Sequence, residues 1–132
     1  MTSQQIEFFF DIGSPYSYLA ATQIPDLEEE TGVPVDWRPF LLGGVFKEVG
    51  NRPPAQIQEK GAYMLQDLNR WADFYEEPFQ MNSNFPINSL LAQRALVAVE
   101  QFDGADISDL AMALSRDYWT DDGDVYRPEA VA

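Results

Sequence analysis

The hydrophobic and polar positions along this chain predict two β-strands followed by a series of helices. Residues 5–11 are expected to form the first strand, and within them only Glu7 interrupts the isoleucine and phenylalanine run at 6–10. A run of this kind is typical of a strand that is buried on both faces. Residues 33–40, "VPVDWRPF", are expected to form a second strand, with Val33, Val35 and Trp37 on one face.

A helix is expected between the two strands, from about Pro15 to Glu30. Pro25 should bend or interrupt it, because proline cannot donate the backbone hydrogen bond that a helix interior requires. Gly32 is placed where a helix commonly ends in a left-handed residue. A strand, a long helical connection and a second strand together predict a right-handed parallel β-α-β unit.

Beyond position 40 the pattern changes to helices. Between 56 and 75 an apolar stripe recurs at helical spacing and is expected to be buried; its members are Ile57, Tyr63, Met64, Leu68, Trp71 and Phe74. The later elements are a loop at 78–86, a helix capped by Asn88 that runs to about 102, a helix at 106–119 and a helix start at Pro128.

Composition narrows the range of functions. The chain has 132 residues, of which 45% are hydrophobic, which suits one folded domain. A formal net charge of -14 argues against nucleic acid or an anionic membrane as a partner. The sequence contains no cysteine and no histidine, which excludes thiol–disulfide chemistry by the protein itself, histidine-based catalysis and most zinc sites. We therefore expect no metal site.

Targeting signals are not apparent in the sequence. No apolar run is long enough to span a bilayer, and residues 1–10 lack the positively charged start of a signal peptide. A cytoplasmic location is therefore the expectation.

The segment "GSPYS" at 13–17 connects the first strand to the helix that follows it. Serine before proline is a common helix start, so Ser14 is expected to be an N-cap. Thioredoxin-like folds place a Cys-x-x-Cys pair at this corner, and here hydroxyl groups stand in place of both sulfur atoms. A cap hydroxyl at a helix start can also serve a bound anion. Ser14 thus has two candidate roles, whereas Ser17 is expected to be structural.

Three motifs, "FDIGSPYSYLA", "WRPFLLGGVFKEVGNRPP" and "KGAYMLQDLNRWA", resemble the 2-hydroxychromene-2-carboxylate isomerase family and the related kappa-class glutathione transferases. The resemblance implies an α/β fold, in which a thioredoxin-like β-α-β half carries an all-helical inserted domain. It places the thioredoxin-like unit at 1–45 and the helical insertion at 46–132. The second half of the thioredoxin unit, with its cis-proline loop, is expected to be absent from this chain.

The same resemblance implies glutathione as the cofactor and assigns roles to residues. The serine that matches Ser14 activates the glutathione thiol in that family. The asparagine that matches Asn51 contacts glutathione or the substrate, and the lysine that matches Lys60 lies near the site in some members. Ser14 would donate a hydrogen bond to the sulfur and not attack the substrate, because the chain has no histidine to act as its base.

The basic residues support an anion site in the same region. Four of the eight lie between positions 38 and 60, namely Arg38, Lys47, Arg52 and Lys60. In so acidic a chain, this segment is where a carboxylate would be held, which makes Arg52 a candidate glutathione ligand and Lys47 a candidate substrate ligand. Solvated cations are the alternative, particularly for Arg38 and Lys60. For Asn51 the alternative is a turn residue with a left-handed backbone.

Two classes of function are compatible with the sequence. The first is a glutathione-dependent isomerase that acts on a small aromatic or carboxylate substrate, with glutathione transfer to electrophiles as the enzymatic alternative. The second is a non-catalytic binding or assembly module. In the thioredoxin sheet the first strand is central, so without its second neighbour residues 5–11 would form an exposed apolar edge. A homo-oligomer joined through that edge is therefore expected.

Overall fold

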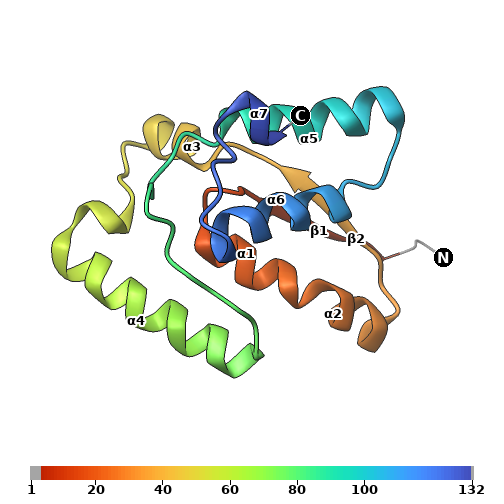
Figure 1. The fold of residues 1–132 in the computed structure, drawn as a ribbon. Coiled ribbons are helices and arrows are strands. Elements are labelled where there is room, and N and C mark those ends of the chain that lie inside the picture. Colours follow the sequence, from red (N-terminus) through yellow and green to blue (C-terminus); the bar gives the residue numbers. More distant parts are fainter. Residues whose placement is uncertain (1–3, 132) are drawn as a thin grey trace.

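Two strands and a series of helices make up residues 4–131, the part of the chain that the computed structural model describes (Figure 1). In chain order they are β1 (Ile6–Phe10), α1 (Pro15–Thr22), α2 (Ile24–Thr31), β2 (Val35–Pro39), α3 (Leu42–Val49), the 3-10 turn η1 (Pro54–Gln56), α4 (Gln58–Tyr75), α5 (Leu90–Asp103), α6 (Ser108–Thr120) and α7 (Pro128–Val131). This order confirms the predicted strand–helix–strand start and the helical remainder.

The two strands pair in parallel, as the sequence predicts. Their register aligns Ile6 with Val35 and Phe10 with Pro39. The ring of Trp37 meets that of Phe10 edge to face, with 5.3 Å between the ring centroids. Aromatic contacts of this geometry stabilise a pair of strands beyond the burial of their apolar area.

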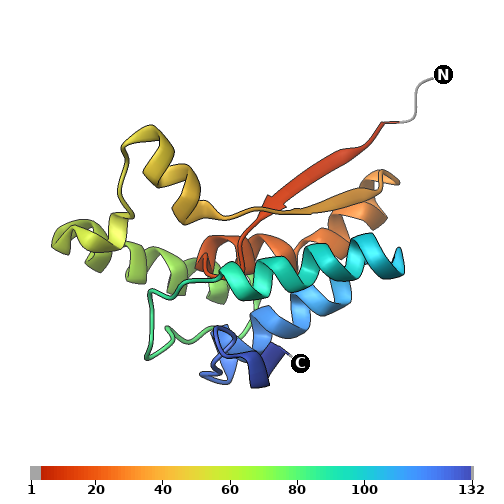
Figure 2. The ribbon, with the colours of Figure 1, turned by 90° about the horizontal axis from the view of Figure 1, so that it is seen from above.

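Strand β1 is covered on one face only, which corrects the expectation of burial on both faces. Phe10 is buried, but Phe9 is 58% exposed and Glu7 is exposed as well. The reason is architectural. Helices α1, α2, α5 and α6 lie on the same side of the two strands (Figure 2), and within residues 4–131 β1 has β2 as its single neighbour.

Pro25 divides the predicted helix into two. Helix α1 ends at Thr22 with Gln23 as its C-cap, and α2 begins at Ile24 with Pro25 in its first turn. Proline is accommodated in a first turn because the N–H it lacks would have no partner inside the helix there. Gly32 ends α2 with a φ of 67°, the left-handed cap that the sequence predicts.

Helix α4 buries only part of the apolar stripe that was predicted for it. Its buried residues are Met64, Leu68 and Ala72, while Tyr63 is 60% and Trp71 43% exposed. The prediction that Tyr63 and Trp71 belong to the core is therefore wrong. Helix α4 packs mainly against η1 and α1, which cover only one narrow side of it.

The start of α5 differs from the prediction by one position. Ser89 is the cap residue, and the side chain of Asn88 accepts the N–H of Leu90 at 3.0 Å. Boundaries of one or two residues commonly shift in this way, because neighbouring polar side chains compete for the same unpaired N–H groups.

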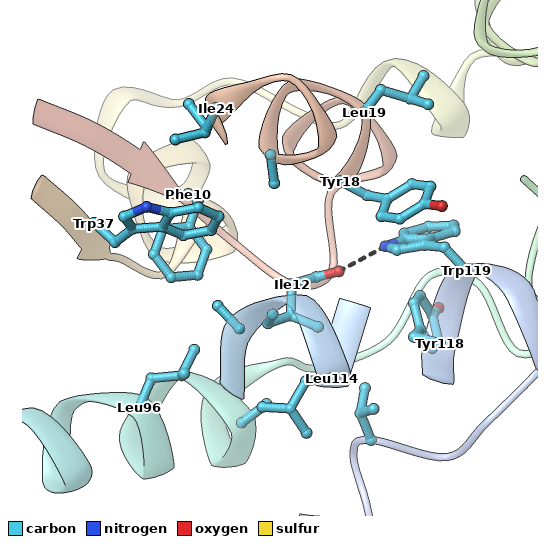
Figure 3. Close-up of a cluster of buried hydrophobic side chains, with 14 of the residues drawn as sticks. Phe10, Ile12, Tyr18, Leu19, Ile24, Trp37, Leu96, Leu114, Tyr118 and Trp119 are labelled. Atoms are coloured by element: carbon cyan, nitrogen blue, oxygen red, sulfur yellow. Dashed lines mark hydrogen bonds between the residues drawn. The ribbon is translucent and has the colours of Figure 1, made fainter. Parts of the chain in front are cut away.

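One hydrophobic core connects the two strands with the later helices (Figure 3). Phe10, Ile12 and Trp37 meet Leu96 of α5 and Trp119 of α6 in a single buried cluster. The indole N–H of Trp119 donates to the carbonyl of Ile12 at 2.9 Å, which fixes the loop that leads to α1. Over the described residues, no helix combines the length and the apolar character needed to cross a membrane.

Candidate functional site

Ser14 is the N-cap of α1, which confirms the structural role expected for it. Its backbone is extended, with φ -100° and ψ 120°, and Pro15 follows at the first helical position. The Ser14 Oγ accepts the N–H of Ser17 at 3.2 Å. The Ser14 N–H donates to the carbonyl of Asp11 at 2.9 Å. The hydroxyl thus sits at the positive end of the α1 dipole.

Ser17 has a structural role, as expected, but with a partner outside its own helix. Its Oγ accepts the N–H of Asp11 at 3.3 Å. The second hydroxyl of the corner therefore ties the end of β1 to the first turn of α1.

A cavity of about 710 Å³ opens beside Ser14. Its walls come from the start of α1, from α3, from residues 53–55, from Met64 of α4 and from the loop at 85–89. Most of the lining is apolar, and Phe46 and Phe85 are among its members. The peptide bond between Phe85 and Pro86 is cis, so a cis-proline loop lies within this chain beside Ser14. The resemblance implied a cis-proline loop only in the second half of the thioredoxin unit, so a cis proline at this position was not expected.

The structure brings two of the five candidate residues into this cavity. Ser14 and Lys47 both line it, whereas Asn51, Arg52 and Lys60 do not. Lys60 lines a second hollow of about 380 Å³, which shares Tyr16, Pro54 and Met64 with the first. The five residues therefore do not meet in one place.

Asn51 and Arg52 lie on the exposed segment that follows α3. The Asn51 side chain accepts the N–H of Arg52 at 2.9 Å. The positive φ of this turn, 70°, belongs to Gly50. Asn51 therefore does not adopt the left-handed backbone that we considered as its alternative role. The binding roles of Asn51 and Arg52 stay predictions.

Arg38 is engaged away from the cavity. Its guanidinium lies 2.7 Å from the carboxylate of Asp36 and 4.0 Å from that of Glu7, on the strands. Of the basic cluster seen in the sequence, Lys47 is the member that reaches the wall beside Ser14.

Three buried polar residues support the corner, and the sequence analysis missed all of them. Asp11 is 3% exposed, and its carboxylate accepts hydrogen bonds from the Gly13 N–H, the Leu42 N–H and the Ser89 hydroxyl. Gln93 accepts the N–H of Ile12 at 3.2 Å. An aspartate directly after a buried apolar strand was the available signal, since such a charge must find partners.

Tyr16 connects α1 to α4 at the mouth of the cavity. Its hydroxyl donates to the carboxylate of Asp67 at 2.7 Å. Burial, and secondarily this hydrogen bond, raise the pKa of Tyr16 to about 12. Tyr16 is therefore a neutral hydrogen-bond donor at physiological pH, and it shapes the wall that both hollows share.

The chain is similar to known proteins along most of its length. A family model for the DSBA-like thioredoxin domain matches residues 5–132. Glutathione S-transferase kappa 1 of Caenorhabditis elegans is 45% identical over 75 residues, which are 56% of this chain and 33% of that protein. The 2-hydroxychromene-2-carboxylate isomerase of Sphingobium xenophagum is 36% identical over 85 residues, 63% of this chain and 44% of that protein.

A solved structure of 2-hydroxychromene-2-carboxylate isomerase superposes with a TM-score of 0.76 at 23% identity. The superposition covers 97% of this chain and 64% of that one, and it shows a shared fold. The chain thus spans from about a third to just under two thirds of the length of these proteins.

Proposed function

The chain belongs to the family of DSBA-like thioredoxin domains, and on this premise we propose that it acts with glutathione as an isomerase of the 2-hydroxychromene-2-carboxylate isomerase type. Ser14 is the proposed catalytic residue, with its hydroxyl donating a hydrogen bond to the glutathione sulfur. The similarity to proteins named for this isomerase and for glutathione transferases supports the proposal.

The observation that carries the proposal is the hydrogen bonding of Ser14. Its oxygen accepts the N–H of Ser17, which leaves the hydroxyl proton available for donation to another partner. Within residues 4–131 we find no acceptor for that proton. Since Ser14 lines the cavity, a bound sulfur is the partner that the proposal supplies.

The strength of this arrangement suits a thiolate. A hydrogen bond to a charged group contributes about 1.5–3 kcal/mol, and a helix N-terminus adds about 0.3–1 kcal/mol for an anion. At about 1.4 kcal/mol per unit, the two together lower a thiol pKa by roughly 1.5–3 units from its ordinary value near 8.5. The bound thiol would then be about half to almost fully ionised at pH 7.

When bound, glutathione supplies a thiolate that can add reversibly to a conjugated double bond and so allow rotation about it. The apolar wall around Phe46 and Phe85 suits a planar aromatic substrate and excludes water from the sulfur. Lys47, on the same wall, is the proposed ligand of a substrate carboxylate.

Asn51, Arg52 and Lys60 are the proposed ligands of glutathione itself. Glutathione carries two carboxylates beyond its thiol, and it is long enough to extend from Ser14 along the cavity wall. Asn51 and Arg52 directly precede Pro53, which lines the cavity, and Lys60 lines the adjoining hollow. Their exposure leaves their side chains available to a ligand at the cavity mouth.

Glutathione transfer is the second candidate, because the 45% identical relative is a transferase by name. Both reactions use the same thiolate and differ in the substrate that the cavity admits. Product analysis separates them, since an isomerase returns glutathione unchanged and a transferase consumes it.

The test is an ultraviolet titration of glutathione bound to the chain, preceded by calorimetry to establish binding. Ser14→Ala should raise the pKa of the bound thiol by about one to two units, the loss of one charged hydrogen bond. Ser115→Ala is the matched control, because Ser115 is buried on α6 outside the cavity. An unchanged titration in Ser14→Ala would leave Ser14 with its capping role alone, and an absence of glutathione binding would favour a non-catalytic module.

A further inference from the structure

Asp11 is a buried carboxylate for which the proposed chemistry has no use. It is 3% exposed and lies on the cavity wall, three residues before Ser14. Oδ1 accepts the Gly13 N–H at 2.8 Å and the Ser89 hydroxyl at 2.5 Å, and Oδ2 accepts the Leu42 N–H at 2.8 Å. A buried carboxyl group that is held by this many donors is fixed in position in the folded protein.

The three partners of Asp11 belong to three separate walls of the cavity. Gly13 is in the corner before Ser14, Leu42 is the first residue of α3, and Ser89 caps α5. The cap residue of α3, Leu41, offers no side-chain hydrogen bond of its own. The Asp11 carboxylate, 31 positions earlier in the chain, therefore caps α3 by accepting the N–H of Leu42.

The corner is also closely packed around this carboxylate. A Cβ atom at Gly13 would lie 3.3 Å from Asp11 Oδ1 and 3.4 Å from the Cβ of Ser89. Behind it, the Gln93 side chain accepts from Ile12 N–H and donates to the carbonyls of Phe10 and Phe40. The backbone that leads into Ser14 is thus held at successive residues.

We infer that Asp11 is the positioning residue of this site, which fixes the direction of the Ser14 hydroxyl by holding the β1–α1 corner against α3 and α5. The inference rests on the proposed function, because it concerns the geometry of the same thiolate. Asp11 acts through Gly13 and the backbone of the corner, and it makes no proposed contact with the sulfur.

Substitution by asparagine separates positioning from charge. In Asp11→Asn the side chain would have one accepting oxygen and one donating NH₂ group opposite the N–H groups of Gly13 and Leu42. One of these backbone donors would lose its partner and the corner would shift, so the hydrogen bond from Ser14 would weaken and the pKa of the bound thiol would rise. Removal of a negative charge near the thiolate would by itself lower that pKa. The two explanations predict opposite signs.

The experiment is the ultraviolet titration of bound glutathione in the 132-residue chain and its variants. In Asp11→Asn we expect the pKa of the bound thiol to rise by about one unit, which is a tenfold lower ratio of thiolate to thiol. Ser89→Ala keeps the charge of Asp11 and removes one of its hydrogen bonds, so it should give a smaller rise of the same sign. If Asp11→Asn does not fold, Ser89→Ala alone tests the positioning role through the pKa of the bound thiol.

Asn82→Ala is the matched control for a general loss of stability. Asn82 is also 3% exposed and also takes part in three hydrogen bonds, to Tyr118, Gly123 and Asn84, but it lies outside the cavity. It should destabilise the fold and leave the thiol pKa unchanged. If the wild type binds glutathione as a thiolate but the pKa of the bound thiol falls or stays unchanged in Asp11→Asn and Ser89→Ala, the positioning role alone would be overturned. No thiolate in the wild type would overturn the proposed function together with this inference.

Discussion

Replacement of Trp119 by phenylalanine tests how strongly the later helices hold the corner that carries Ser14. Trp119 is fully buried on α6, and its ring meets Tyr118 edge to face at 4.4 Å between centroids. Its indole N–H donates to the Ile12 carbonyl at 2.9 Å, over a sequence separation of 107 (Figure 3). Phenylalanine keeps an aromatic ring in place but removes the donor and part of the ring.

The expected cost follows from these contacts. A buried carbonyl that loses its partner costs about 1–3 kcal/mol. The two ring carbons that are lost with the nitrogen contribute roughly 0.8 kcal/mol each, as for buried methylene groups. The sum lowers the free energy of unfolding by about 3–5 kcal/mol, a large part of the roughly 5–15 kcal/mol that folded domains possess.

Urea denaturation followed by far-ultraviolet circular dichroism measures this change. With a slope near 2 kcal/mol per molar urea, the midpoint should fall by roughly 2 M. Trp71→Phe is the matched control, since Trp71 is 43% exposed on α4, and it should change the stability by no more than about 0.5 kcal/mol. Equal effects of the two substitutions would show that the Trp119 hydrogen bond does not hold the corner.

Three further predictions address the ligand site and the sheet edge. Arg52→Ala should weaken glutathione binding more at low salt than at high salt, whereas Asn51→Ala should weaken it equally at both, and negligible effects in calorimetry would place the ligand elsewhere. Because the pKa of Tyr16 is raised to about 12, its stabilising effect is complete below pH 10 and is lost as the pH rises through 12. Asp67→Asn should therefore lower that pKa in a tyrosinate absorbance titration, and an unchanged value would deny the role of the hydrogen bond. Finally, the open edge of β1 with its exposed Phe9 should make the chain self-associate, and Phe9→Lys should reduce this in light scattering. A stable monomer of the unsubstituted chain would contradict the last prediction.

Local chemistry was sufficient to determine the elements around the site. The parallel pairing of β1 and β2 followed from the order of the elements and the length of the helical connection. The break at Pro25, the left-handed cap at Gly32 and the N-cap at Ser14 all follow from residues within a few positions of one another. Each depends on a property that a residue carries with it, such as the missing N–H of proline or the conformational freedom of glycine. The sequence can therefore be read directly for such features.

Helical periodicity was less informative about burial. The spacing of Tyr63 and Trp71 correctly indicated a helix, but it could not tell whether another element would cover that side. Met64 and Leu68 of the same predicted stripe are buried, but the contact is too narrow to cover Tyr63 and Trp71 as well. Phe9 is exposed for the same kind of reason, since the outward face of a strand is covered only when a further layer is present.

Only the tertiary structure decided how the site is supported. Asp11 meets Leu42 and Ser89 over sequence separations of 31 and 78, and Gln93 meets Ile12 over 81. Contacts of this kind have no period and no local motif. They arise because a buried polar group must find a partner wherever the folded chain offers one, and that choice is made only when α3, α5 and the β1–α1 corner come together.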